Sequence, residues 1–252
     1  KWAEVVNELL STNQSRSATN PTVLNWRQRD YLARCLPDLI VLLEPPLVHK
    51  QIWSILKMLL RDSVNVVRDD ALWSVPVLLQ SYCAENLARW KNVAEHAKKF
   101  SVEACNEVLA WLKESMLRIG SKRSASFCER QLFCQICTAV GLALRFGTGE
   151  VKESKDPVSV LSDKFKTFFE ENNVENGPYE RLTLAEQKHL KRLLTTELLP
   201  LAIDMKEDPI SNVRITLMKG LQIMPSDIRE SSVVKTTLRD LEDEAETWTS
   251  YG

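Results

Sequence analysis

The stretch that decides the fold spans residues 56–79 and reads LKMLLRDSVNVVRDDALWSVPVLL. Its apolar residues recur at spacings of three and four, which is typical of amphipathic helices, and they fall into two runs. A short polar turn that starts at Asp62 separates the runs, and the second run begins beside Arg68. The stretch therefore predicts a helical hairpin, two helices joined by a tight turn.

A second stretch, residues 198–217, repeats this design and reads LLPLAIDMKEDPISNVRITL. Asp208 and Arg214 are six residues apart, which is also the separation of Asp62 and Arg68. Two hairpins of one design in a single chain are typical of repeat architectures. In these, each helix pair buries its apolar face only by stacking on its neighbours.

The helical periodicity extends over most of the chain. Aligning Pro37 with Pro76 also aligns Arg29 with Arg68, at an offset of 39 residues. This offset is close to the repeat length of about 40–47 residues known for stacked helix-pair proteins. We expect helices at residues 1–11, 23–44, 47–61, 67–82, 102–119, 124–146, 184–205, 213–224 and 226–242, with the start of a further helix at 243–252.

Residues 148–180 depart from the repeat. They are charged at both ends, and Asp156-Pro157 starts a helix between them, because proline is well tolerated in a first helical turn. We expect this insertion to pack back onto the repeats. The alternative is that its apolar side, between Val158 and Phe169, docks into a groove of a partner.

The composition favours an all-α protein without a nucleic-acid or membrane partner. Only 7 residues are glycine, whereas 44% are hydrophobic, which is enough to form a core. The 33 basic and 34 acidic side chains give a net charge of -1, so the chain lacks the basic footprint on which nucleic-acid binding depends. No apolar run reaches the ~18 residues needed to cross a bilayer. Because no methionine precedes Lys1, we expect a fragment of a longer protein.

The sequence shows no clear catalytic or metal-binding pattern, and we expect no cofactor and no metal. The three histidines are scattered, and none lies at a catalytic spacing from a carboxylate or a serine. Cys134 and Cys137, with Cys128 upstream, form a lone Cys-x-x-Cys pattern, which is a weak metal signal without a second pair of ligands. Cysteines that lie mainly in apolar helical stretches are typical of reduced core thiols, which predicts a cytoplasmic or nuclear protein.

The hairpin pattern Leu-Leu-x-Asp-x-x-x-x-Val-Arg resembles HEAT repeats. Residues 25–37, NWRQRDYLARCLP, are similar to an Asn-Trp-Arg signature in the HEAT-repeat scaffold subunits of protein phosphatase 2A. The order of units that follows resembles the HEAT-repeat regulatory subunits of protein phosphatase 4. The resemblance implies an all-α fold, a right-handed α-solenoid of antiparallel helix pairs. We expect one such solenoid of about four to five repeats over residues 1–252, with the insertion at 148–180.

In this family, the turns between paired helices line a ridge that holds the phosphatase catalytic subunit or regulatory partners. The turn positions that match, and that the resemblance marks as partner-binding, are Asn25, Trp26, Asp62, Ser63, Asn65, Asp208, Pro209, Ser211 and Asn212. The family's Asp and Arg residues link adjacent repeats in a ladder. The positions that match the ladder are Arg29, Asp62, Arg68, Asp208 and Arg214.

Two roles fit these residues. Trp26 is either a binding anchor, since tryptophan is enriched among interface hot spots, or a cover for the end of its own helix pair. The Asp and Arg residues either contact a partner or have a structural role. We expect the structural role, in which Asp caps the helix that follows and Arg pairs across the repeat boundary.

The sequence thus predicts a non-catalytic scaffold or regulatory subunit that fixes the catalytic subunit of a Ser/Thr phosphatase relative to its substrates. The expected partner is a catalytic subunit of the protein phosphatase 2A type, in particular that of protein phosphatase 4, with a further regulatory subunit or a substrate as a second partner. Two alternatives stay open. One is a HEAT-repeat adaptor unrelated to phosphatases, such as a transport or assembly factor, and the other is an enzyme with an unrecognised site.

Overall fold

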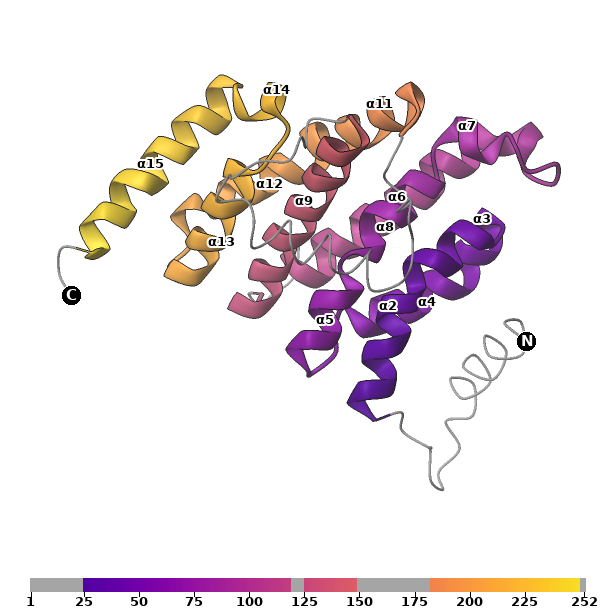
Figure 1. The fold of residues 1–252 in the computed structure, drawn as a ribbon, viewed down its shortest axis with the longest axis horizontal. Helices are drawn as coiled ribbons and strands as arrows, with labels where there is room; N and C mark the ends of the chain where they lie inside the picture. The colour runs from indigo at the N-terminus through magenta and orange to yellow at the C-terminus, as the bar shows by residue number, and fades with distance from the viewer. Residues whose placement is uncertain (1–24, 119–124, 149–181, 250–252) are drawn as a thin grey trace. The chain divides into compact units, whose positions relative to one another are not determined.

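A computed structural model describes residues 25–118, 125–148 and 182–249, and every regular element in these ranges is a helix (Figure 1). The all-α class follows directly. The helix predicted over residues 1–11 and the insertion beyond Thr148 lie outside the described residues. No helix in the described part is long and apolar enough to span a membrane.

The internal contacts divide the chain into two compact units, which meet in sequence between Ala71 and Leu72. We call them the first unit and the second unit and treat each by itself. The continuous solenoid over residues 1–252 stays a prediction.

The first unit consists of a long helix followed by a hairpin. Its elements are α2 (Trp26–Leu42), α3 (Pro45–Leu47), the π-helical segment η1 (Val48–Ile52), α4 (Trp53–Leu59) and α5 (Asn65–Ala71). The segments α3, η1 and α4 follow one another without a break, and α2 packs against η1, α4 and α5. The apolar stripes predicted from spacing face this core, where Leu36, Ile40, Ile52, Leu56 and Val67 are buried.

The second unit is organised around helix α9 (Phe127–Gly147) (Figure 1). Its other elements are α6 (Ser74–Ser81), α7 (Ala84–Leu87), η2 (Ala94–His96), α8 (Ala97–Met116), α11 (Leu184–Leu193), η3 (Leu194–Leu198), α12 (Leu199–Ile203), η4 (Asp204–Glu207), α13 (Ser211–Gln222), α14 (Ser226–Arg229) and α15 (Ser232–Thr249). Helix α9 packs against α6, α8, α11, α12 and α13, and α15 packs on α13. Between Leu132 and Leu144 every residue of α9 except Gln135 is buried, as expected of a helix surrounded by others.

Both units contain the same arrangement of three elements, which we call the ladder module. In the first unit it comprises α2, η1–α4 and α5, and in the second unit α9, η3–α12–η4 and α13. In both, the long helix contacts the π-helical segment, the helix after it and the last helix, and the end of the hairpin's first arm contacts its second, as α4 does α5 and η4 does α13. The π-helical segments begin at Val48 and Leu194, each 14 residues before the aspartate of its hairpin. The two hairpins therefore keep one register from the π-helical segment to the turn.

A proline inside a helical stretch, such as Pro200, favours a break or bend. The helix does change there, from π geometry to α12, and Pro200 occupies the first turn of α12. The first module has the same π segment, although Ser54 stands at the position of Pro200. Proline is therefore not the cause of the π segment.

Several predicted helix boundaries are wrong. The helix expected at residues 226–242 is divided, because α14 ends at Arg229 and α15 begins at Ser232, and the helix expected at 102–119 begins earlier, at Ala97. The helix expected at residues 67–82 is split, because α5 ends at Ala71 and α6 begins at Ser74. Pro76 accounts for the split, since it has no N–H to donate to the carbonyl of Leu72 and its ring would clash with that carbonyl. The new helix expected at residues 243–252 does not start there, because α15 continues to Thr249.

Helices α9 and α13 come very close together at Gly220. A Cβ atom at this glycine would lie 2.2 Å from Oγ1 of Thr138 on α9. The Thr138 hydroxyl is held in place, because it donates a hydrogen bond to the carbonyl of Cys134 at 2.9 Å. The glycine therefore sets how closely the two helices of the second module pack.

We expect Gly220→Ala to lower the free energy of unfolding by about 1–3 kcal/mol because it overpacks this contact. The loss should appear even though alanine is the better helix former by about 1 kcal/mol. Urea denaturation of Gly220→Ala, Thr138→Ala and the double variant checks this, with the exposed Lys219→Ala on the same helix as control. The double variant should lose less unfolding free energy than the two single variants lose in total. Strict additivity would show that Thr138 does not confine position 220.

Candidate protein interface

Asp62 is the centre of the polar contacts in the first unit. Its carboxylate accepts two hydrogen bonds from Arg29, from Nε at 2.5 Å and from Nη2 at 3.0 Å. Oδ1 also accepts the backbone N–H of Val64 at 2.9 Å. Arg68 Nη1 donates to the backbone carbonyl of Asp62 at 2.6 Å, and Arg68 Nη2 donates to Asn65 Oδ1. Because a bidentate Arg–carboxylate pair fixes orientation as well as distance, Arg29 holds the turn against α2.

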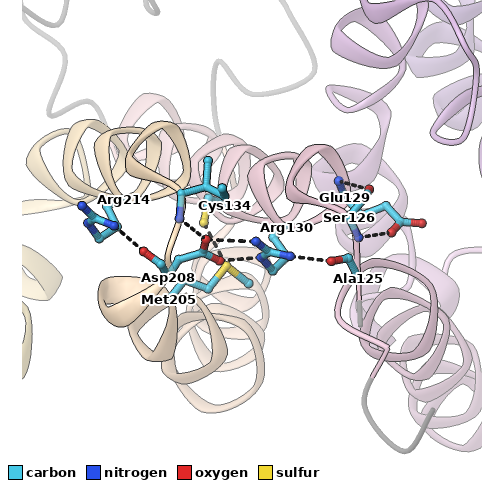
Figure 2. Close-up of polar contacts among 9 residues, drawn as sticks. Ala125, Ser126, Glu129, Arg130, Cys134, Met205, Asp208 and Arg214 are labelled. Carbon is cyan, nitrogen blue, oxygen red and sulfur yellow. Dashed lines mark hydrogen bonds and ion pairs between the residues drawn. The ribbon is translucent and has the colours of Figure 1, made fainter. Parts of the chain in front are cut away.

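Asp208 repeats these contacts in the second unit. Figure 2 shows it between Arg130 of α9 and Arg214 of α13. Arg130 donates to both carboxylate oxygens, with Nη2 3.0 Å from Oδ1. The backbone N–H of Ile210 donates to Oδ1 at 2.9 Å, and Arg214 Nη1 donates to the carbonyl of Asp208. Arg214 also forms an ion pair with Glu244 of α15, at 2.8 Å.

The expected division of roles between Asp and Arg needs two corrections. Neither aspartate caps a helix in the usual way, because each carboxylate accepts the N–H two residues on, in the turn itself, and Ile210 occupies the N-cap position of α13. Arg68 and Arg214 each donate to the carbonyl of their own turn. The arginines that join the turn to the preceding long helix are Arg29 and Arg130.

The electrostatics of the two aspartates are alike. Burial raises the pKa of each carboxyl group, but the hydrogen bonds from arginine and from the backbone N–H outweigh it. The pKa of Asp62 and that of Asp208 therefore lie below the ordinary value. Their side chains are only 7% and 4% exposed. A buried charge of this kind requires its partner, so the aspartates serve the fold and leave little surface for another protein.

The long helix of each module begins with a capping box. In the first unit, Asn25 Oδ1 accepts the N–H of Gln28 at 3.1 Å, and the N–H of Asn25 donates to Gln28 Oε1 at 2.9 Å. In the second unit, Ser126 and Glu129 exchange the same two bonds, at 3.3 and 2.7 Å. The reciprocal bonds satisfy two backbone donors at the helix end and fix where each helix starts.

An exposed aromatic residue follows each cap. Trp26 is 41% exposed and Phe127 is 46% exposed. Each stands three residues before the arginine of its module, Arg29 or Arg130, so aromatic and arginine share one side of the helix. Because the arginine binds the turn aspartate, the aromatic is presented on the same side as the turn. The guanidinium of Arg27 lies 4.8 Å from the centre of the Trp26 ring.

The remaining predicted partner-binding residues lie on the surface of the two turns. Ser63 and Asn65 are exposed in the first unit, as are Pro209, Ser211 and Asn212 in the second. We define the first turn surface as Trp26, Arg27, Arg61, Ser63, Asn65 and Val66, and the second turn surface as Phe127, Cys128, Glu207, Pro209, Ile210, Ser211 and Asn212. In each unit the predicted site residues lie at the start of the long helix or in the turn, and Arg29 or Arg130 connects these two places through the turn aspartate.

Sequence reasoning missed the residues that complete the second group. Arg130 and Phe127 were not singled out, although their pattern is visible in the sequence. Ser126-Phe127-Cys128-Glu129-Arg130 repeats Asn25-Trp26-Arg27-Gln28-Arg29 by residue type at four of five positions: cap, aromatic, amide or carboxylate, and arginine. Aligning Arg29 with Arg68 by the proline offset hid this match, because it compared a long helix with the helix after a turn.

A second carboxylate group lies between α2 and α5. Arg34 donates to Asp30 Oδ2 and to Asp70 Oδ2, each at 2.9 Å. Burial, together with the nearby carboxylate of Asp30, raises the pKa of Asp70 to about 6, against the opposing effect of Arg34. Asp30 is buried, and its Oδ1 has no hydrogen-bond partner within the described residues. The two aspartates therefore share one cation inside the unit.

The cysteines of the Cys-x-x-Cys pattern are packed in the core. Cys134 Sγ lies 3.3 Å from the sulfur of Met205, and burial raises the pKa of its thiol to about 12. Burial likewise raises the pKa of Cys137. Among the described residues, no three His, Cys, Asp or Glu side chains are grouped in a way that could hold a metal ion. The packing role expected for Cys137 agrees with this environment.

His189 and Cys105 form a second pair of potentially reactive groups. His189 Nε2 lies 3.7 Å from Cys105 Sγ and 3.1 Å from the carbonyl oxygen of Leu79. Because a carbonyl only accepts, Nε2 carries a hydrogen and does not remove the proton of the thiol. Burial lowers the pKa of His189 and raises that of Cys105 to about 12. The contact joins α6, α8 and α11. The thiol stays protonated and the imidazole does not act as its base, so the pair has a structural role.

Comparison with known proteins adds no identity: no family model matches the chain, and no curated protein and no solved structure is significantly similar to it.

We expect Arg130→Ala to lower the free energy of unfolding by about 3 kcal/mol, because it leaves the charge of Asp208 buried without its partner. Arg130→Lys should recover only part of the loss, since lysine cannot bind a carboxylate in bidentate fashion. The control is Lys235→Ala, whose ion pair with Glu230 is 59% and 57% exposed. It should cost ~0.5 kcal/mol or less. If Arg130→Ala and Lys235→Ala lowered the free energy of unfolding equally in urea denaturation, the Arg130–Asp208 pair would contribute no more to stability than an exposed ion pair.

The pKa of Asp70 predicts a dependence of stability on pH. Its value of about 6 in the folded chain exceeds the ordinary unfolded value of about 3.9. The contribution of Asp70 to stability should therefore fall as the pH rises from about 4 to about 6 and level off above that, whereas His189, whose pKa is lowered, contributes in the opposite direction. We expect Asp70→Asn to abolish this fall and to stabilise the protein at pH 7 by roughly 1–3 kcal/mol. Thermal midpoints from pH 4 to 8 check this, with Asp204→Asn, at an exposed site, as control. A midpoint at pH 7 no higher than that of the unchanged protein would contradict it.

Proposed function

We propose that the chain is a non-catalytic scaffold or regulatory subunit. It binds the catalytic subunit of a protein phosphatase 2A-like Ser/Thr phosphatase, in the first instance protein phosphatase 4, through its two turn surfaces. The observation that carries the proposal is the recurrence of the ladder module. The same arginine, aspartate and exposed aromatic occur together in both units. We name a phosphatase catalytic subunit as the partner because the hairpins and the Asn25–Pro37 segment resemble HEAT-repeat phosphatase subunits.

The chemistry of the turn surfaces supports a binding role. The charges of Asp62 and Asp208 are used within each module, so a partner meets an aromatic ring and short side chains. Aromatic residues are enriched at the centres of protein interfaces, where a few of them carry much of the binding energy. The mechanism is one of position: the turns fix the enzyme relative to its substrates, and the chemistry takes place on the partner. Cytoplasm and nucleus, the compartments expected from the thiols, are where such a complex would act.

Binding of the catalytic subunit can be tested with a matched control that the chain itself offers. The full chain is immobilised, and the affinity of purified catalytic subunits of protein phosphatases 4 and 2A is measured. We expect Trp26→Ala and Phe127→Ala each to weaken binding about tenfold or more, as interface hot spots do. Leu184→Ala is the control. Leu184 is 64% exposed and also follows a capping residue, Thr183, but Gln187 stands where a ladder module has arginine. It should change the affinity less than about twofold, as a surface change outside an interface does.

Two results would contradict the proposal. Equal affinity for all three variants, with their folding intact, would remove the turn surfaces from the interface. No binding of either catalytic subunit to the unchanged chain would remove the phosphatase and leave the adaptor as the better hypothesis.

A further inference from the structure

Glu186 is a buried carboxylate without a positively charged partner among the described residues. It stands in the first turn of α11 and is 6% exposed. Its Oε1 accepts hydrogen bonds from Gln80 Nε2 at 2.9 Å and from Asn86 Nδ2 at 2.6 Å, and its Oε2 accepts the backbone N–H of Thr183 at 2.7 Å. None of these donors carries a charge. Because buried charges are as a rule paired or bound to a metal ion, Glu186 lacks the usual compensation.

The other two capping boxes in the described part of the chain avoid this situation. Glu129 occupies the same place in the box of α9, but Arg118 pairs with it at 2.9 Å. The box of α2 has the uncharged Gln28 there. Of the three boxes, the one of α11 therefore combines a charged residue with neutral partners only.

The carboxyl group of Glu186 is charged at neutral pH. Burial raises its pKa, but the hydrogen bonds from Asn86, Gln80 and Thr183 outweigh this effect, so the pKa lies below the ordinary value. His189 is close enough to feel this charge, yet burial lowers the pKa of His189 and keeps its imidazole neutral near pH 7. The histidine therefore does not supply a compensating positive charge.

The two amides that bind Glu186 leave their own oxygens without partners. Gln80 Oε1 and Asn86 Oδ1 are both buried, and neither has a hydrogen-bond partner within the described residues. A buried acceptor that has given up water without gaining a donor is unfavourable. These three side chains thus contain an uncompensated charge and two unsatisfied oxygens, and a single ligand that attracts oxygen would resolve all three.

Each amide can bring its oxygen to Glu186 instead of its nitrogen, because half a turn about the last side-chain bond exchanges the two atoms within the same volume. Gln80 Oε1 and Asn86 Oδ1 then face Glu186 Oε1. Asn86 Oδ1 also faces the backbone carbonyl oxygen of Gln80, from which Asn86 Nδ2 lies 3.2 Å away. Four oxygens without a hydrogen between them repel one another, whereas a cation among them binds all four. The helix dipole favours a cation here as well, because Gln80 lies in the last turn of α6.

The charge of these groups determines which cation fits. The four oxygens carry one negative charge in total, that of Glu186, so a singly charged ion makes the group neutral. A divalent ion would leave a net positive charge in a buried place, which is costly. Carbonyl oxygens replace the hydration shell of K⁺ in channel filters, whereas thiolate and imidazole are the ligands that softer metals prefer. Because both amide oxygens are buried, a small ion reaches them more easily than a side chain of another protein.

We propose that Gln80, Asn86 and Glu186 form a binding site for a singly charged metal cation, K⁺ or Na⁺. The ion binds the carboxylate, both amide oxygens and the carbonyl oxygen of Gln80, and it joins α6, α7 and α11 inside the second unit. The site involves neither turn surface, so it goes beyond the proposed function and is tested independently of it.

Thermal unfolding of the full chain in three salts tests the site. The salts are KCl, NaCl and tetramethylammonium chloride, each at about 0.15 M, so that general screening of charges is the same. Tetramethylammonium is the reference because its methyl groups keep oxygen ligands away from its charge. The variant Glu186→Gln removes the charge but keeps the capping box, since Gln28 fills the same place in the box of α2. Its matched control is Glu129→Gln, which removes a capping-box charge that Arg118 already compensates.

We expect the equilibrium constant for folding of the unchanged protein to be about tenfold larger in KCl or NaCl than in tetramethylammonium chloride, the effect of an ion at about ten times its dissociation constant. The thermal midpoint should rise by ~3 °C or more. Glu186→Gln should unfold at the same temperature in all three salts, whereas Glu129→Gln should keep the difference. Equal midpoints of the unchanged protein in all three salts would mean that water alone satisfies the amide oxygens, and would overturn the proposal. An undiminished difference in Glu186→Gln would overturn it too, since the ion would then act elsewhere.

A change in the charge of the site should change the ion that it binds. Asn86→Asp gives the site a second carboxylate, and we expect about 5 mM Ca²⁺ to raise its thermal midpoint by more than KCl does, because carboxylates suit a divalent ion. The control is Asn92→Asp, which adds the same charge at an exposed position between α7 and η2. The unchanged protein and the control should not respond to Ca²⁺. If Ca²⁺ but neither K⁺ nor Na⁺ stabilised the unchanged protein, the assignment of a singly charged ion would be wrong.

Discussion

The hydrogen-bonded pair between one arginine and one buried aspartate determines how each module is built. The arginine uses two donors on both carboxylate oxygens, and a backbone N–H of the turn completes the set. The turn is held from its other side as well, because a second arginine donates to the carbonyl of the same aspartate. Since the carboxylate is almost fully buried, it cannot exchange these partners for water, so the turn has one conformation relative to the long helix. Position and orientation of the turn therefore follow from the contacts of a single aspartate.

Much of this could be predicted from the sequence, and the limits have physical reasons. Apolar spacing places most helices, and the shared Asp-to-Arg separation identifies both hairpins. The partner of Asp208 was missed because Arg130 lies 78 residues earlier in the chain, across residues 148–180, whereas Arg29 lies 33 residues before Asp62. The π-helical segments were missed because VHKQI and LTTEL share no identical residue. They have in common an aliphatic residue at each end and an amide or carboxylate at the fourth position, a pattern that ordinary α-helices also show. Their common cause must lie in packing against α2 and α9, which sequence spacing does not report.

The chemistry of the buried polar groups argues against reading them as reactive sites. Burial raises the pKa of the Cys105 and Cys134 thiols to about 12, which keeps both protonated. The one histidine in contact with a thiol donates its ring hydrogen to a carbonyl instead. These groups are satisfied where they are, and they connect helices of the second unit.

The buried contacts of a ladder module and the exposed residues of its turn surface differ in how well they tolerate substitution. Replacing Arg29 or Arg130 leaves a buried charge without its partner, which costs several kcal/mol, whereas replacing an exposed charge outside such a pair costs well under about 1 kcal/mol. A module can therefore keep its geometry while the charges beside its aromatic residue vary freely. The two units illustrate this, because the same bonds hold turns with arginine at one position and glutamate at its equivalent. Repetition of these contacts fixes the geometry of the turn, and the exposed positions around it are where the two units differ.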